Sequence, residues 1–329
     1  MKIVRKMRKE VWIGLLAISL LGAMTCQKEL PEQSNDKELS GTITLSGAWA
    51  LYPMAVRWAE EFQKIHPKVN IDIAAGGAGK GMADCLAEAV DLGMVSRDIF
   101  PAEIEKGAYW FSVTMDAVVP TVNEQNPVLK ELLHQGVTKE SLIGIWITGA
   151  VKEWGAVCGV AVQEPIRVYT RSDACGAAQT WAQYLGKNQE DLLGVGVYGD
   201  PGLAEAVGKD ELGIGFNNIN YAYDAQTKRQ VKLLRVLPID INGNGQIDAD
   251  EDFYTSMDEI IQAIGVGKYP SPPARLLHFV SQGRPKRKIV QEFVKWVLTQ
   301  GQQYVSESGY IKLPEDKIRQ ELEKLAEGR

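Results

Sequence analysis

A regular alternation of strand-like and helix-like segments constrains this chain more than any other feature. In "GTITLSGAW" (41–49) apolar and polar residues alternate, which is typical of a strand. The next segment (50–67) places Met54, Trp58 and Phe62 at helical spacing and ends at Pro67, which cannot continue a helix. A strand leading into a helix follows over 69–90, and another strand begins at 91. This alternation predicts a parallel sheet with helices on both faces.

The same alternation continues through the rest of the chain. We expect a strand at 110–123, a helix at 138–149, a strand–turn–helix unit at 164–185 and strands within 209–223 and 231–241. The last part is expected to be mostly helical (258–265 and 318–325), with one strand at 275–281. No repeat of solenoid period is present. The pattern predicts an α/β protein.

Four turns share one arrangement, because each follows an expected strand and opens a helix. They are "SGAWALYP" (46–53), "AAGGAGKG" (74–81), "VDLGMVSRDI" (90–99) and "YTRSDACGAA" (169–178). Backbone N–H groups and the positive helix ends then converge on one region. Glycine lets the backbone approach a ligand closely, and Arg171 adds a positive charge for an oxyanion. Any one such turn is usually a plain tight turn, and only the order of all four, which matches one known family, favours a shared cleft that binds an anion.

Read together with "DAVVPTVNEQNPV" (116–128) and "GYIKLP" (309–314), these turns resemble the phosphate-binding proteins of ABC importers. That family is a branch of the type II periplasmic-binding-protein fold, and the resemblance covers residues 41–315. It implies two α/β domains, each a sheet flanked by helices, with the ligand in the cleft between them and a hinge that closes on binding. We expect domain 1 at 41–118 plus 224–329 and domain 2 at 119–223.

The resemblance also implies which residues face the ligand. They are Ser46, Ala48, Trp49, Ala78, Gly79, Ser96, Arg97, Arg171, Asp173, Cys175, Gly176 and Ala177. Ala78, Cys175 and Ala177 stand where the family has hydroxyl donors. A hydrogen bond to a charged partner contributes roughly 1.5–3 kcal/mol, so three lost bonds would weaken anion binding thousands-fold unless backbone N–H groups compensate. Trp49 either walls the cleft, stacks on a larger ligand or packs in the core.

The segment "DINGNGQIDADE" (240–251) matches the calcium loop of EF-hand proteins. Its six ligand positions are Asp240, Asn242, Asn244, Gln246 (through its backbone carbonyl), Asp248 and Glu251. A calcium sensor usually pairs two such loops between helices, but this one is single and follows a strand-like segment. We therefore expect a structural calcium ion near the interdomain crossover, with a Kd on the order of 10⁻⁴ M. The alternative is a polar surface loop with a chance pattern.

The first 26 residues resemble a bacterial lipoprotein signal. A basic start precedes an apolar run that is short for a membrane-spanning helix, and the run ends just before Cys26. Met24 and Thr25 depart from the usual small pair, so a plain secretory signal is the alternative. Residues 27–40 form a polar tether. We expect an extracytoplasmic (periplasmic) protein that is anchored to the membrane through lipidated Cys26.

Composition narrows the classes of function. Without residues 1–26 the chain has 31 basic and 41 acidic residues, a net charge near −10 (36 − 5 and 42 − 1). An acidic chain is a poor nucleic-acid binder, and "RPKRK" (284–288) is interpreted as the solvated start of a helix. Three scattered histidines and no zinc-type spacing argue against a zinc hydrolase. Of Cys85, Cys158 and Cys175, at least one is a free thiol unless it pairs with another chain.

These observations predict a monomeric solute-binding lipoprotein that presents phosphate or a similar oxyanion to an ABC permease and is not an enzyme. Three alternatives stay open. The same fold can bind another oxyanion or a small organic anion, or it can serve as an extracellular sensor or scaffold subunit. A secreted phosphatase is the third, and the scarcity of histidine and of clustered carboxylates outside the 240–251 loop weighs against it.

Overall fold

The structure is a computed structural model and describes residues 38–327. Cys26, the signal segment and the tether up to Lys37 lie outside the described residues. The strands are β1 Gly41–Gly47, β2 Val69–Ala75, β3 Leu92–Val95, β4 Ala108–Asn123, β5 Arg167–Arg171, β6 Val195–Val197, β7 Gly213–Asn218, β8 Leu234–Val236 and β9 Ala274–Gln282.

The α-helices lie between these strands and after the last of them. They are α1 Tyr52–Ile65, α2 Ala78–Leu86, α3 Pro101–Glu105, α4 Leu129–Gln135, α5 Lys139–Ile143, α6 Trp154–Cys158, α7 Gly176–Tyr184, α8 Gly199–Gly208, α9 Ile219–Ala222, α10 Met257–Gly265, α11 Lys288–Leu298 and α12 Glu315–Ala326. Short helical turns occur at η1 Gly144–Thr148, η2 Gln189–Asp191 and η3 Gln300–Tyr304.

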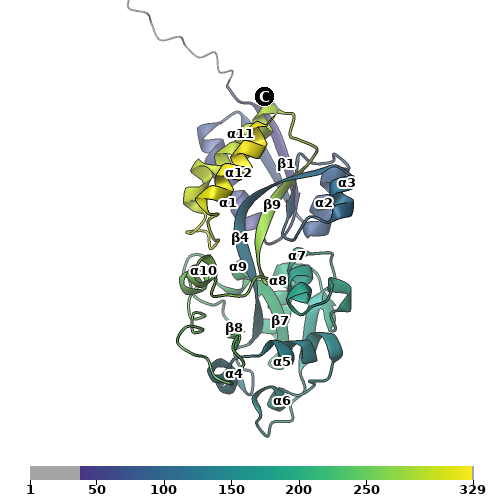
Figure 1. The fold of residues 1–329 in the computed structure, drawn as a ribbon, viewed down its shortest axis with the longest axis vertical. Coiled ribbons are helices and arrows are strands. Elements are labelled where there is room, and N and C mark those ends of the chain that lie inside the picture. Colours follow the sequence, from purple (N-terminus) through teal and green to yellow (C-terminus); the bar gives the residue numbers. More distant parts are fainter. Residues whose placement is uncertain (1–37, 328–329) are drawn as a thin grey trace, which may run out of the picture. The chain divides into compact units, whose positions relative to one another are not determined.

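The strands form one mixed sheet in the order β2-β1-β3-β9-β4-β7-β5-β6, with β8 added to β4. At the two ends of this order, β1 pairs in parallel with β2 and β3, and β5 with β6 and β7. In the middle, β4 and β9 are antiparallel to each other and to their other neighbours. The predicted parallel pairing is correct for β1–β3 and for β5–β7 but not for β4 and β9, which join the two parallel halves (Figure 1).

Two hydrophobic cores divide the described chain into two lobes. The core of lobe 1 combines β1–β3, α1, α2, α11 and the adjoining parts of β4 and β9. The core of lobe 2 combines the second part of β4 with α5, α7, β7 and residues up to Ala274. The expected α/β fold with two sheet-and-helix domains is confirmed. The expected boundary at 224 needs correction, because Val236, Tyr254 and Met257 pack in lobe 2.

The strand β4 passes from one lobe to the other. Its residues Ala108–Ala117 pair with β9, and Val118–Val122 then pair with β7. The partner strand β9 also has Ala274 in the core of lobe 2 and Leu277 in the core of lobe 1. Figure 1 shows β4 and β9 running side by side through this crossing. Any movement of the lobes relative to each other must therefore bend these two strands.

Helix α1 shows how the sequence pattern positions the first turn. Met54, Trp58 and Phe62 are buried, as their helical spacing predicts. The Nε1 of Trp58 donates to the carbonyl of Gly301 (2.8 Å), which ties the helix to the chain after α11. Pro53 lies in the first turn, where a missing N–H costs nothing. The turn between β1 and α1 is thus fixed on one side by the pairing of β1 in the sheet and on the other by the packing of α1.

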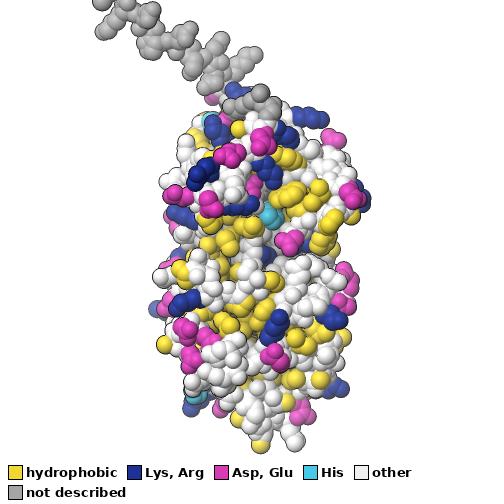
Figure 2. Space-filling model, in the orientation of Figure 1, with side chains coloured by type: hydrophobic (Ala, Val, Ile, Leu, Met, Phe, Trp, Pro, Cys, Tyr) yellow, Lys and Arg dark blue, Asp and Glu magenta, His cyan; other side chains and the backbone are white. Residues whose placement is uncertain are grey.

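The surface of the lobes carries charges of both signs. Figure 2 shows Lys and Arg interspersed with Asp and Glu over the visible face. No helix in the described part of the chain is both long enough and apolar enough to cross a lipid bilayer. The three cysteines of the lobes, Cys85, Cys158 and Cys175, are free thiols and are buried.

Candidate ligand-binding cleft

The four turns of the sequence pattern meet where the two lobes touch. The turns after β1, β2 and β3 belong to lobe 1, and the turn after β5 belongs to lobe 2. The amide of Gly79 donates to the carbonyl of Ala174 across the interface (3.0 Å). Gly176 lies so close to Ser96 that a methyl group on it would stand 2.2 Å from the Ser96 carbonyl oxygen. The lobes are therefore closed on one another at the turns.

Glycines make this close packing within lobe 1 geometrically possible. Gly47 has φ +132, and a Cβ there would lie 2.3 Å from the carbonyl oxygen of Met94. Its own carbonyl accepts hydrogen bonds from the amides of Gly76 and Gly77 (2.9 and 3.0 Å). Only glycine combines that backbone conformation with that lack of space. The first two turns are consequently locked together before any ligand binds.

Two of the expected donors of lobe 1 already have partners. The hydroxyl of Ser46 donates to the carboxylate of Asp84 (2.6 Å). The guanidinium of Arg97 forms two bonds with Glu103 (2.9 and 2.6 Å) and lies 4.0 Å from the centre of the Phe100 ring. The side chain of Arg97 is thus neutralised within its own lobe. Within residues 38–327 the hydroxyl of Ser96 has no hydrogen-bond partner.

Arg171 is the central cation of the cleft, at the end of β5. Its side chain is fully buried, and it donates to both carboxylate oxygens of Asp173 (2.8 and 2.7 Å) and to Asp200 (2.6 Å). Burial alone would lower the pKa of Arg171, but the charge of Asp200 and the bonds to Asp173 outweigh burial and raise it. Three of its five N–H groups are used in these bonds and two are not.

The three positions without family hydroxyls are all buried at the turns. Ala78 and Ala177 present methyl groups, with exposed fractions of 0% and 2%. The thiol of Cys175 accepts a hydrogen bond from the amide of Ala178 (3.4 Å) and thus caps α7. Burial raises the pKa of Cys175 to about 12. The thiol is therefore protonated at neutral pH and is not poised as a nucleophile.

Trp49 lies between the lobes, at the mouth of the turns. Its ring contacts Tyr198 edge-on, with centroids 6.4 Å apart, and faces the backbone of Gly199. Its carbonyl accepts a hydrogen bond from the hydroxyl of Tyr221 in lobe 2 (3.1 Å). The indole N–H of Trp49 is buried and has no partner among the described residues. This position favours the role of a wall of the cleft over that of a core residue.

Three buried charged residues beside the turns were missed by the sequence analysis. Asp200 opens α8, while Asp116 on β4 faces Arg275 on β9 in register. Arg275 donates to the carbonyl of Gly176 (2.8 Å) and to the side chain of Asn218. For Asp116 and Arg275 the available signal was a lone charge within an apolar strand, because burying a charge is costly unless it is paired.

The 240–251 loop lies on lobe 2, against the end of α4. The amide of Ile247 donates to the carbonyl of His134 (3.0 Å), and the amide of Asp240 donates to that of Val137 (3.1 Å). The expected position near the interdomain crossover therefore needs correction. The end carboxylates turn inward: Asp240 is 3% exposed and Glu251 is 4% exposed.

The carboxylates of this loop are held by the loop itself. Asp240 accepts from the amides of Gly243 and Gly245 (2.7 and 2.9 Å), as in a tight turn. Asp248 accepts from the side chains of Asn242 and Asn244 (2.9 and 2.8 Å), which lower its pKa. Among the described residues, no group of three or more His, Cys, Asp and Glu side chains is clustered tightly enough to hold a metal ion.

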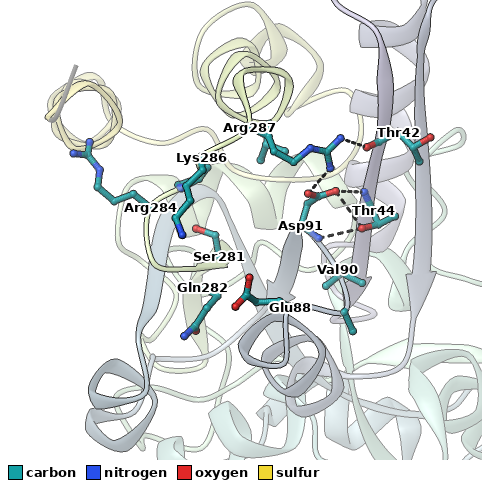
Figure 3. A pocket seen from close by; sticks show the side chains of 13 residues that line it. Thr42, Thr44, Glu88, Val90, Asp91, Ser281, Gln282, Arg284, Lys286 and Arg287 are labelled. Atoms are coloured by element: carbon teal, nitrogen blue, oxygen red, sulfur yellow. Dashed lines mark hydrogen bonds and ion pairs between the residues drawn. The ribbon is translucent and has the colours of Figure 1, made fainter.

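A hollow of about 370 Å³ lies at the end of lobe 1, between the loops before β3 and after β9 (Figure 3). Arg284, Lys286 and Arg287 line it opposite Glu88 and Asp91. Arg287 is paired with Asp91 (2.5 Å), and Arg284 donates to backbone carbonyls of α12. None of the expected ligand residues lines this hollow. The cleft between the lobes is therefore the better candidate for the principal site.

The fold defines a two-lobed α/β protein in which four strand-to-helix turns meet between the lobes. A family model described as the PBP superfamily domain matches residues 32–300. The chain belongs to this superfamily.

Individual relatives agree with this assignment. Protein SphX of Synechococcus elongatus is 26% identical over 283 residues, covering 83% of this chain and 77% of its own. The phosphate-binding protein PstS of Pseudomonas aeruginosa is 25% identical over 329 residues and covers 92% of this chain and 91% of its own. A Clostridium perfringens structure with bound phosphate, provisionally named a phosphate ABC transporter substrate-binding protein, has a TM-score of 0.68 at 20% identity. The match covers 83% of this chain and 100% of the chain in that structure.

Proposed function

We propose that this protein is the extracytoplasmic solute-binding component of an ABC importer and encloses phosphate between its lobes. The observation that carries the proposal is the meeting of four strand-to-helix turns at the lobe interface, closed by the bond from Gly79 to Ala174. The phosphate-binding protein PstS and the phosphate-bound Clostridium perfringens structure suggest the ligand class and the transport role. The permease partner and the monomeric state stay predictions.

The donors for phosphate must come mainly from the backbone. Ala78, Cys175 and Ala177 offer no hydroxyl, and the hydroxyl of Ser46 is used by Asp84. The available replacements are the two unused N–H groups of Arg171, the unbonded hydroxyl of Ser96 and the first amides of α2 and α7 other than those of Gly79 and Ala178, which already donate within the described residues. Amides at a helix N-terminus suit an anion, because the helix dipole adds a favourable field.

A thermal-shift titration of the purified chain with phosphate tests this function. A ligand that binds only the folded state at 100 times its Kd stabilises by about 2.7 kcal/mol, so we expect a rise of roughly 5 °C. Sulfate, molybdate and tungstate are compared at the same ionic strength, with calcium kept constant. If the melting temperature does not change with phosphate concentration, phosphate is not the ligand.

A different anion is the second candidate for the same cleft. The loss of three family hydroxyls at Ala78, Cys175 and Ala177 is the observation that favours it. The titration above distinguishes the two ligands, because a rise with another oxyanion alone would assign the cleft to that ion. A sensor would bind its ligand in the same cleft and would differ from an importer component only in the protein to which it passes the signal.

We also propose that the 240–251 loop binds one calcium ion. The complete ligand spacing supports this, together with the inward-facing Asp240 and Glu251 and the lowered pKa of Asp248. Oxygen ligands of this kind, with the φ of +81 at Gly245, fit the ion's preference for a flexible oxygen shell. The ion would stiffen the connection between β8 and α10 on lobe 2.

Calcium titration of the melting temperature tests this site. With a Kd on the order of 10⁻⁴ M, about 10 mM calcium is expected to stabilise the protein by about 2.7 kcal/mol, and EGTA should reverse the effect. Glu251→Gln should remove the calcium response. Asp250→Asn is the matched control, because Asp250 is an exposed carboxylate in the same loop at a non-ligand position. Equal responses of both variants would contradict the assignment.

Membrane anchoring through Cys26 is a further part of the proposal. The support comes from the sequence alone, namely the basic start, the apolar run and the polar stretch 27–40. Mass spectrometry of the mature N-terminal peptide decides between an acylated Cys26 and an ordinary signal-peptide cleavage.

A further inference from the structure

Five buried ionisable side chains surround the turn after β5. Two are cations and three are carboxylates, with side-chain exposures between 0% and 8%: Arg171, Arg275, Asp116, Asp173 and Asp200. Before any ligand enters, the carboxylates outnumber the cations by one when all five are ionised. An oxyanion adds further negative charge to this cluster. Unless one of these side chains changes its charge, repulsion between the carboxylates and the oxyanion weakens binding.

Asp116 is the weakest-held carboxylate of the cluster. Arg171 contacts both Asp173 and Asp200 at hydrogen-bonding distance. In contrast, the nearest nitrogen of Arg275 is 3.7 Å from Asp116, and both carboxylate oxygens of Asp116 are buried without a hydrogen-bond partner in residues 38–327. The dipoles of the nearby Ala117 and Ile219 amides lower the pKa of Asp116, but by less than burial raises it. Burial raises the pKa of Asp116 to about 7.

The charged and titratable groups around Asp116 leave it no second cation. Arg275 faces it from β9 and Asp200 from the start of α8. Tyr221 on α9, Tyr269 before β9 and Tyr310 after η3 also couple to it. Burial raises the pKa of all three tyrosines, so they are neutral at physiological pH. Asp116 thus shares Arg275 with the carbonyl of Gly176 and the side chain of Asn218.

We propose that the cleft takes up one proton from solvent, onto the Asp116 carboxylate, when it encloses an oxyanion. This inference rests on the proposed function. Arg275 connects Asp116 to the turn that holds the ligand, because it bonds to the carbonyl of Gly176. Like charges about 10 Å apart in a protein repel enough to change affinity about tenfold. Neutral Asp116 removes that repulsion and leaves Arg275 free to balance the ligand.

Calorimetry of phosphate binding in buffers of different ionisation enthalpy counts the protons taken up. At pH 7.5 the wild-type chain should take up more protons per phosphate than Asp116→Asn, by about half a proton, because a tenfold change in affinity raises the pKa of Asp116 by about one unit from about 7. Phosphate itself changes protonation near neutral pH, and comparing the two proteins cancels that contribution. Asp116→Asn should bind phosphate about tenfold more tightly than wild type at pH 8.5, and equally at pH 5.5. Asp72→Asn is the control, since Asp72 is an exposed carboxylate on β2.

The outcomes separate the two proposals. If neither the wild-type chain nor either variant binds phosphate at any pH, the proposed function fails and the proton coupling fails with it. If wild type and Asp116→Asn bind phosphate with the same proton count, only the coupling is overturned.

Unfolding measurements without ligand test the carboxylate independently. The pKa of Asp116 is raised from 3.8 to about 7, so the folded state binds its proton more tightly than the unfolded state does. The contribution of this group to stability is fully present below pH 4 and is lost as the pH rises to 7. Asp116→Asn should therefore gain stability relative to wild type over this range. Parallel pH profiles for the two proteins would overturn the assignment of the proton to Asp116.

Discussion

Gly176→Ala is expected to lower phosphate affinity by at least about 100-fold while leaving each lobe folded. A methyl group at this position would lie 2.2 Å from both the carbonyl oxygen and the hydroxyl of Ser96, across the lobe interface. Ser96 belongs to lobe 1 and directly follows β3, so it cannot move aside unless the end of that strand moves with it. The lobes must therefore stay apart, and a closed state populated 100-fold less reduces the apparent affinity by the same factor.

Calorimetry measures the affinity, and small-angle X-ray scattering with and without phosphate measures closure. Gly176 starts α7 with an ordinary backbone conformation, so alanine itself is tolerated there and the ligand-free melting temperature should change little. Gly265→Ala at the end of α10 is the matched control, because its methyl group meets nothing closer than 3.8 Å. Phosphate binding by Gly176→Ala at wild-type strength would show that the ligand is not held by this closure.

The turns of the cleft were predictable because their signals are local. Gly47 and Gly77 adopt positive φ values of 132 and 91 where the sequence places glycine after an alternating strand. Strand, turn and helix are each encoded within a few residues, so the alternation gave the correct order of elements. The turns after β1, β2 and β3 lie together because parallel strands end at the same edge of a sheet. The turn after β5 faces them because the parallel half that contains β5 runs in the opposite direction.

Strand pairing over long sequence distances was not predictable in this way. Asp116 and Arg275 each appear as a single charge in an apolar strand, but only the register of β4 against β9 places them opposite each other. The boundary at 224 was wrong for the same reason. The sequence pattern showed that Leu237 and Ile239 are apolar, but not that they would pack in lobe 2 rather than lobe 1.

The availability of a donor was also hidden in the sequence. Ser46 and Arg97 have the correct residue types for an anion site, yet Asp84 and Glu103 occupy their donors. Residue type states what a side chain can donate, whereas the neighbouring carboxylates decide whether the donor is free. Arg171 is held by two carboxylates and, like Arg97, retains N–H groups that make none of these bonds.

Arg171→Met is expected to destabilise the protein by about 3–5 kcal/mol and to abolish measurable phosphate binding. Methionine keeps an unbranched side chain of similar length but leaves Asp173 and Asp200 without their cation, and both carboxylates are buried. Removing one partner of a buried ion pair costs about this much because the other charge stays uncompensated. Urea denaturation measures the loss, and the slope of the transition checks that unfolding stays two-state.

Arg167→Met on the same strand is the matched control. Its side chain is 60% exposed and pairs with Asp210 (2.9 Å), and exposed pairs contribute at most about 1 kcal/mol. Adding Asp200→Asn to Arg171→Met removes one unpaired carboxylate, so the double variant should be more stable than Arg171→Met alone, although it still cannot bind phosphate. This combination separates the two roles of Arg171, since stability should recover and affinity should not. An Arg171→Met chain as stable as wild type would mean that solvent, and not Arg171, compensates the two carboxylates.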